Sequence, residues 1–159
     1  MAGLVCYNII MSLQEQIKAD FKAAMLAHDE VKKLTISGLK SAMQYKKVAL
    51  GNQADLTEDQ MLDVVAAQVK QRDDSIAIYQ QAGDTERAAA EQAQRDILAA
   101  YLPKPLSADE LSAVAHEVIT ANNFTMKDMG KAIAAVKAKV GHAATGGDIA
   151  AAVKRSFNQ

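Results

Sequence analysis

Glycine and proline are scarce in this chain of 159 residues, which contains eight glycines and two prolines. A β-sandwich or barrel needs many tight turns between short strands, and these two residue types supply most such turns. Apolar residues instead recur at helical spacing along the chain, and no segment of useful length alternates between apolar and polar residues. The sequence therefore predicts an all-α protein.

Capping signals indicate where several of the helices begin. A serine or threonine followed three residues later by Glu or Gln occurs at residues 12–15, 57–60 and 107–110. Each such pair can satisfy the first backbone N–H groups of a helix. A further helix is predicted to begin at Asp84 or Thr85, after Gly83 has ended the preceding one in a left-handed conformation. The apolar stripe of the second helix is expected to comprise Ile36, Leu39, Met43 and Leu50.

Both prolines lie within three residues, at Pro103 and Pro105. Each lacks an N–H group and disfavours the α conformation in the residue before it, so no helix passes through this segment. We predict a bundle of about four helices over residues 12–102, a proline-containing linker over 103–107 and a small tail domain of about three helices over 108–159. Residues 1–11 are uncharged, lack the basic region of a secretory signal and are too few to span a bilayer, so we predict an extension or disordered arm there.

Residues capable of catalysis or metal binding form no recognisable motif. The histidines His28, His116 and His142 are isolated from one another, and Cys6 is the single cysteine. Zinc sites and nucleophile elbows need ligands or a serine at fixed spacings that this sequence lacks. We therefore expect no metal, no cofactor, no membrane association and no self-contained active site. The single cysteine fits the reducing cytoplasm, which is the predicted location.

Charge is unevenly distributed, although the formal net charge is only −1. Residues 126–159 carry six basic and two acidic side chains, whereas the rest of the chain carries twelve and seventeen. Residues 31–54 form a second basic block, with five lysines and no acid. Such asymmetry favours a polyanionic partner. Within the second block Lys33, Lys40 and Lys47 repeat every seven residues and form one stripe, which is either a solvated helix face or a phosphate-binding ridge.

One glycine-rich loop, residues 141–147, interrupts the basic C-terminal segment. The phosphate loop of an ATPase would place Lys and then Ser or Thr after its second glycine and would follow a strand, and this loop does neither. Two interpretations stay open: the loop binds a nucleic-acid phosphate through N–H groups at a helix start, or it only permits tight helix packing. The candidate nucleic-acid-binding residues are Lys127, Lys131, Lys137, Lys139, Gly141, His142, Gly146 and Lys154.

Four ordered motifs resemble those of the GatB/YqeY family. They are Lys70-Gln71-Arg72 with Ser75, Glu91 followed by Tyr101-Leu102-Pro103, Met126-Lys127-Asp128-Met129-Gly130-Lys131, and Val140-Gly141-His142-Ala143 with Val153-Lys154. The resemblance runs from residue 11 to about residue 157 and implies a helical domain followed by a small helical tail.

The resemblance also implies kinship with the C-terminal region of GatB in the glutamine-dependent aspartyl/glutamyl-tRNA amidotransferase. In that enzyme this region helps to hold tRNA, while other domains carry out amide transfer. Ser37, His142 and Gly147 depart from the family pattern. Arginine is common at the first two of these positions, and its loss removes a bidentate contact to phosphate.

Three functions are consistent with these features. The leading hypothesis is a non-catalytic RNA-binding module, with tRNA as the partner, that contacts phosphates through the candidate residues. The second is a protein-interaction module, in which apolar helices and seven methionines adapt to a partner protein. The third, participation in carbon–nitrogen ligation with glutamine as amido donor, rests on the family resemblance alone. The first hypothesis requires the C-terminal lysines to share one exposed surface beside the glycine-rich loop.

Overall fold

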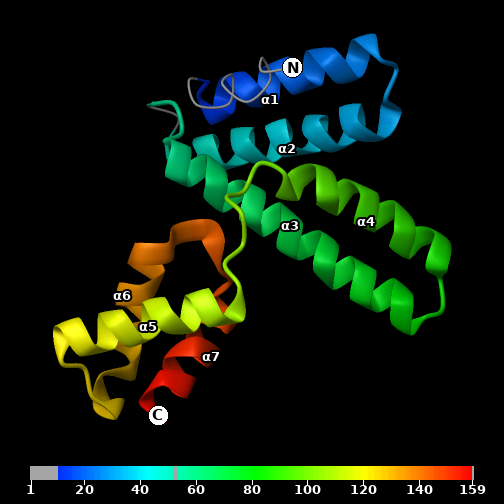
Figure 1. The fold of residues 1–159 in the computed structure, drawn as a ribbon. Coiled ribbons are helices and arrows are strands. Elements are labelled where there is room, and N and C mark those ends of the chain that lie inside the picture. The colour runs from blue at the N-terminus through cyan, green and yellow to red at the C-terminus, as the bar shows by residue number, and fades with distance from the viewer. Residues whose placement is uncertain (1–10, 52–53, 159) are drawn as a thin grey trace, which may run out of the picture. The chain divides into compact units, whose positions relative to one another are not determined.

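The computed structural model describes residues 11–51 and 54–158, so the predicted extension, Cys6 included, lies outside the described residues except for Met11. Within these ranges the elements are helices joined by turns, and the predicted all-α fold is confirmed (Figure 1). The α-helices are α1 (Leu13–Leu26), α2 (Glu30–Ala49), α3 (Glu58–Gln81), α4 (Thr85–Ala99), α5 (Ala108–Asn122), α6 (Met129–Val140) and α7 (Gly146–Phe157). Two short 3₁₀ segments, η2 (Met126–Asp128) and η3 (Gly141–Ala143), lie on either side of α6.

The helix starts follow the capping residues. Ser12, Thr57 and Ser107 each accept a hydrogen bond from the backbone N–H three residues later, and the Glu or Gln side chain at that position accepts one from the capping residue's own N–H. These reciprocal bonds satisfy N–H groups that have no partner inside the helix. The three predicted helix starts are therefore confirmed.

The ends of α2 and α3 depend on two glycines with positive φ. Gly83 has φ +73° after α3, the left-handed conformation that the sequence predicts. Gly51 has φ +89° and follows the end of α2. Leu50 lies beyond the last turn of α2 and is 52% exposed, so its expected place in the apolar stripe of that helix was wrong.

The chain divides into two compact units between Leu102 and Pro103. In the first unit α1 packs against α2, and α3 runs antiparallel to α4 as a longer pair (Figure 1). The buried core of this unit comprises Leu13, Ile17, Ile36, Leu39, Met61, Val64, Val65, Val69, Leu98 and Tyr101. Every helix of the unit, or the turn that follows it, contributes to this one core, so its removal from water stabilises the four helices together.

The second unit packs α5, α6 and α7 around a core of small and branched side chains. These are Leu111, Ala115, Val118, Ile119, Ala132, Val136, Ile149, Ala152 and Val153. The Leu106 N–H donates a hydrogen bond of 2.8 Å to the Ala143 carbonyl, and the Leu106 side chain packs against this core. The end of the proline-containing segment is thereby tied to the glycine-rich loop.

A 3₁₀ turn precedes α6. Residues 126–128 form this turn, η2, and α6 begins at Met129. The Asp128 carboxylate accepts hydrogen bonds from the Thr125 hydroxyl and the Thr125 N–H, at 2.9 and 3.2 Å. These bonds, together with the Lys131 ammonium, hold the pKa of Asp128 below its ordinary value. They close a three-residue turn, which explains the tighter geometry.

Candidate functional site

The candidate lysines of the second unit fall into two groups according to their partners. Lys131 pairs with Asp128 at 3.2 Å, and Lys139 pairs with Glu117 of α5 at 2.7 Å. The other three candidate lysines, Lys127, Lys137 and Lys154, are exposed and form no ion pair with any described residue. Acidic side chains of the same unit therefore offset the charge of two candidate lysines, and the charge of the other three is available to a ligand.

The three lysines of α6 point in different directions around the helix. Ala132 and Val136 are completely buried and define its inward face. Successive residues of an α-helix are rotated by about 100°, so Lys137 lies about 120° from Lys131 and about 160° from Lys139. A single flat surface therefore does not include all three ammonium groups, so an interface on α6 uses either Lys137 or the side that carries Lys131 and Lys139.

The glycine-rich loop joins α6 to α7 and carries its own cap. Gly141 follows α6 with φ +56°, and His142 is half-buried in η3. Thr145 accepts a hydrogen bond from the Asp148 N–H at 3.2 Å, and its hydroxyl donates one to the Asp148 carboxylate at 2.6 Å. An acidic side chain in the first turn stabilises a helix N-terminus, and it also opposes a bound phosphate there. This carboxylate counts against phosphate binding at the start of α7, where Gly146 is exposed. Tight packing does not explain the glycines either, because a Cβ at Gly141 or Gly146 would meet no side chain or neighbouring helix within 4 Å.

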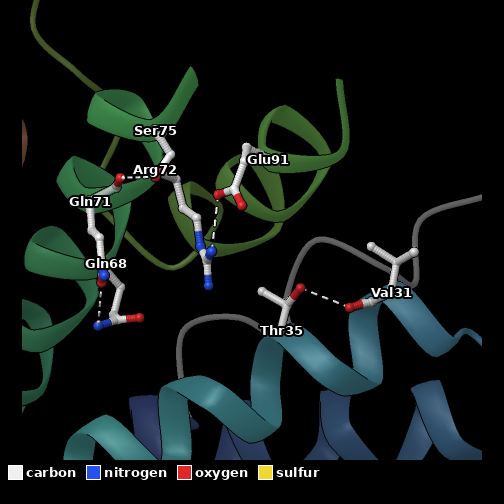
Figure 2. Close-up of polar contacts among 7 residues, drawn as sticks. All are labelled: Val31, Thr35, Gln68, Gln71, Arg72, Ser75 and Glu91. Carbon is white, nitrogen blue, oxygen red and sulfur yellow. Dashed lines mark hydrogen bonds and ion pairs between the residues drawn. The ribbon is translucent and has the colours of Figure 1, made fainter. Parts of the chain in front are cut away.

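A polar cluster on α3 and α4 contains the first family motif. Figure 2 shows Arg72 of α3 and Glu91 of α4 reaching toward each other, with 2.9 Å between Nη1 and the carboxylate oxygen. Both side chains are largely buried, at 26% and 18% exposure, and Arg72 Nε is buried with no partner among the described residues. Arg95 of α4 pairs with Asp73 of α3 at 3.0 Å. The motif therefore joins α3 to α4 by two ion pairs.

Three other polar side chains of the first unit have their partners within their own helices. Ser75 donates to the Gln71 carbonyl at 3.1 Å, and the buried Thr35 of α2 donates to the Val31 carbonyl at 2.7 Å (Figure 2). Lys70 pairs with Asp74 one turn later on the exposed side of α3. None of these contacts brings a nucleophile together with a base, which covalent catalysis requires.

The second family motif ties the end of α4 to α1. The Tyr101 hydroxyl donates a 2.8 Å hydrogen bond to the Asp20 carboxylate, whose other oxygen lies 3.5 Å from Lys32 Nζ. Burial, and next the Asp20 carboxylate, raise the pKa of Tyr101 well above its ordinary value. The tyrosine therefore stays a neutral donor throughout the physiological pH range. Sequence reasoning missed Asp20, because nothing near it in the sequence indicates a partner 81 residues away.

We expect Tyr101→Phe to lower the free energy of unfolding by about 1–2 kcal/mol, because the mutation removes one hydrogen bond to a charged, half-buried acceptor. Denaturant unfolding followed by circular dichroism measures the change. Tyr45→Phe is the matched control, since Tyr45 is 78% exposed. Equal midpoints for the two variants would show that the Tyr101–Asp20 bond does not stabilise the first unit.

Metal clusters and membrane-spanning helices are both missing from residues 11–51 and 54–158. No three His, Cys, Asp or Glu side chains in these ranges are placed so that they hold a metal ion together. Within the same ranges, each helix is too short or too polar to cross a bilayer.

Comparison with known proteins places the chain in a family. A family model described as "Yqey-like protein" matches residues 14–157. The chain is 36% identical over 105 residues to altered inheritance of mitochondria protein 41, mitochondrial, of Saccharomyces cerevisiae, and this alignment covers 65% of the chain and 54% of the yeast protein. The chain is also similar to proteins of the same name from two other yeasts. It is 41% identical over 63 residues to that of Kluyveromyces lactis, an alignment that covers 40% of the chain and 34% of that protein. It is 31% identical over 100 residues to that of Clavispora lusitaniae, and this alignment covers 62% of the chain and 57% of that protein.

The chain thus spans about half the length of the Saccharomyces and Clavispora proteins. The family model, by contrast, covers all seven α-helices of the described residues except the first residue of α1. On this match, and in agreement with the four sequence motifs, the chain belongs to the family of YqeY-like proteins.

Proposed function

We propose that this protein is a non-catalytic RNA-binding module that binds tRNA through contacts to the phosphate backbone. The observation that supports this most directly is that three of the candidate lysines, Lys127, Lys137 and Lys154, are exposed and have no ion-pair partner among the described residues. Ammonium groups of this kind contact phosphates without reading base edges, so they suit recognition by shape and charge.

The distribution of charge between the two units supports the second unit as the RNA-binding one. Residues 103–159 carry seven basic and five acidic side chains, whereas residues 1–102 carry eleven and fourteen. A polyanion is attracted to the unit with the positive balance and repelled by the other. The family relation to the tail of the amidotransferase component GatB makes tRNA the first RNA to test.

The test is a titration of the purified chain with tRNA at several salt concentrations, followed by fluorescence anisotropy. If three phosphates are neutralised, log K is expected to fall linearly with log salt, with a slope of about −2 to −3. A chain that fails to bind tRNA even at about 20 mM salt, where counterion release is most favourable, would contradict the proposal.

A protein-interaction module is the second candidate, and exposed apolar side chains on α2 favour it. Leu34, Tyr45 and Val48 are 66%, 78% and 56% exposed and lie toward one side of the helix. The lysine stripe Lys33, Lys40 and Lys47 runs along the neighbouring face. The partner that fits such a surface is an amphipathic helix whose apolar stripe is flanked by acidic residues. A complex that survives nuclease treatment and requires Leu34 and Tyr45 would distinguish this candidate from RNA binding.

Two other expectations stay predictions. Participation in carbon–nitrogen ligation keeps only the support of the family resemblance. The predicted cytoplasmic location also stays a prediction, and the yeast relatives carry "mitochondrial" in their names.

A further inference from the structure

A pocket of about 250 Å³ lies in the first unit between α1, α2 and the beginning of α3. All of its lining residues belong to the first unit, and neither Arg72 nor Glu91 is among them. Its volume lies just below the roughly 300–1,000 Å³ of typical small-molecule sites, so it suits a compact ligand. Two lysines of the stripe on α2, Lys40 and Lys47, line it together with Lys18 of α1.

Positive charge exceeds negative charge in this pocket by two. The three lysines face a single acidic residue, Asp55, which is 2.7 Å from Lys47 Nζ. Lys47, followed more weakly by Lys18, holds the pKa of Asp55 below its ordinary value, so Asp55 is ionised at neutral pH and offsets one of the three charges.

The other two lysines, Lys18 and Lys40, form no ion pair with any described residue. Lys40 Nζ lies 4.4 Å from the centre of the Phe21 ring. This contact orients the ammonium group and does not neutralise it.

The floor of the pocket is apolar. Ile17 and Met61 are buried in the core of the unit, and Met43 and Leu56 are partly buried beside them. Gln14 and Gln44 add one side-chain amide each, from α1 and α2. A ligand in this pocket therefore contacts ammonium groups and amide donors. It also contacts two methionine side chains, which are flexible and can pack against an apolar part of the ligand.

We propose that this pocket binds a phosphate monoester of a small organic group, with the phosphate between Lys18 and Lys40 and the organic group on the Met43 and Leu56 side chains. A monoester carries nearly two negative charges at pH 7, which match the excess of two, whereas a carboxylate carries only one. The apolar floor distinguishes an ester from inorganic phosphate, because only the ester removes apolar surface from water on binding.

Binding of phenyl phosphate to the full chain, followed by NMR chemical shifts and isothermal calorimetry, tests this assignment. We expect phenyl phosphate to bind at least about tenfold more tightly than benzoate or inorganic phosphate, and binding to weaken as the pH falls below about 6, where the ester loses its second charge. No binding of phenyl phosphate at millimolar concentration, or equal binding of inorganic phosphate, would overturn the proposal.

Two double variants locate the site. Lys18→Gln with Lys40→Gln is expected to weaken the binding of phenyl phosphate at least about tenfold, since both uncompensated charges are removed. Lys22→Gln with Lys46→Gln removes the same charge from the same two helices outside the pocket, and should leave the affinity within about twofold at 0.15 M salt. Equal losses in the two variants would overturn the assignment, because they would indicate attraction by net charge alone.

A 5′-phosphorylated oligonucleotide of four residues distinguishes a free ester from the terminal phosphate of an RNA chain. We expect it to bind no more tightly than phenyl phosphate, because the pocket holds only a compact group. Tighter binding of the oligonucleotide that is lost in the Lys18→Gln, Lys40→Gln variant would overturn the assignment to a small molecule. Loss of tRNA binding by the second unit would leave all these results unchanged, so the two proposals fail independently.

Discussion

Replacing Lys127, Lys137 and Lys154 together by alanine is expected to lower the affinity for tRNA about 100- to 500-fold at 0.1 M salt. Each neutralised phosphate contributes a factor of about five to eight at this salt concentration through counterion release, and the three contributions multiply. The slope of log K against log salt should become less steep by about 2 to 3. Fluorescence anisotropy of labelled tRNA over a range of salt concentrations measures both quantities.

Lys131→Ala with Lys139→Ala is the control for this variant. Each of these lysines is paired with an acidic neighbour, Asp128 or Glu117, so each substitution removes one charge that this neighbour already offsets. If partnered and unpartnered lysines contribute equally, both variants will lose affinity in proportion to the number of lysines removed. That result would refute the distinction on which the proposed interface rests.

Arg72→Ala is expected to lower the free energy of unfolding by about 2–3 kcal/mol, because it leaves the Glu91 side chain four-fifths buried and without its partner. Glu91→Ala should cost a similar amount for the reciprocal reason. The double variant should cost clearly less than the two single variants added together, since neither uncompensated charge remains. Urea unfolding of the four proteins gives the coupling energy directly.

Lys70→Ala provides the matched control for Arg72→Ala. Lys70 belongs to the same motif on the same helix, but it and Asp74 are mostly exposed. Exposed ion pairs contribute little to stability because water and salt screen them. A loss of stability in Lys70→Ala as large as that in Arg72→Ala would mean that the motif stabilises α3 itself and not its packing against α4.

These expectations assign different roles to the family motifs in the two units. In the first unit, Arg72 with Glu91 and Tyr101 with Asp20 join helices, and their chemistry is that of partly buried polar contacts. In the second unit, Asp128 closes the turn before α6. The lysines Lys127, Lys137 and Lys154 of this unit form no ion pair with any described residue. A motif that identifies the family therefore does not by itself identify a binding site.

Much of the local structure was predictable from residues close together in the chain. The starts of α1, α3 and α5 follow from Ser12, Thr57 and Ser107, because a helix cap needs only the two or three residues after it. The left-handed Gly83 follows in the same way, since other residues adopt this conformation at a cost. The all-α fold follows from the spacing of apolar residues, which repeats with the helical period in each segment.

The placement of charges was decided only by the tertiary structure. The sequence shows six basic residues in its last 34 positions, but it does not show that Glu117 of α5 pairs with Lys139 of α6. It also does not bring Lys18 to the same pocket as Lys40 and Lys47. The reason is physical: a cap or a turn depends on hydrogen bonds within a few residues, whereas the partner of a long charged side chain depends on which helices pack together and on how each is rotated about its axis.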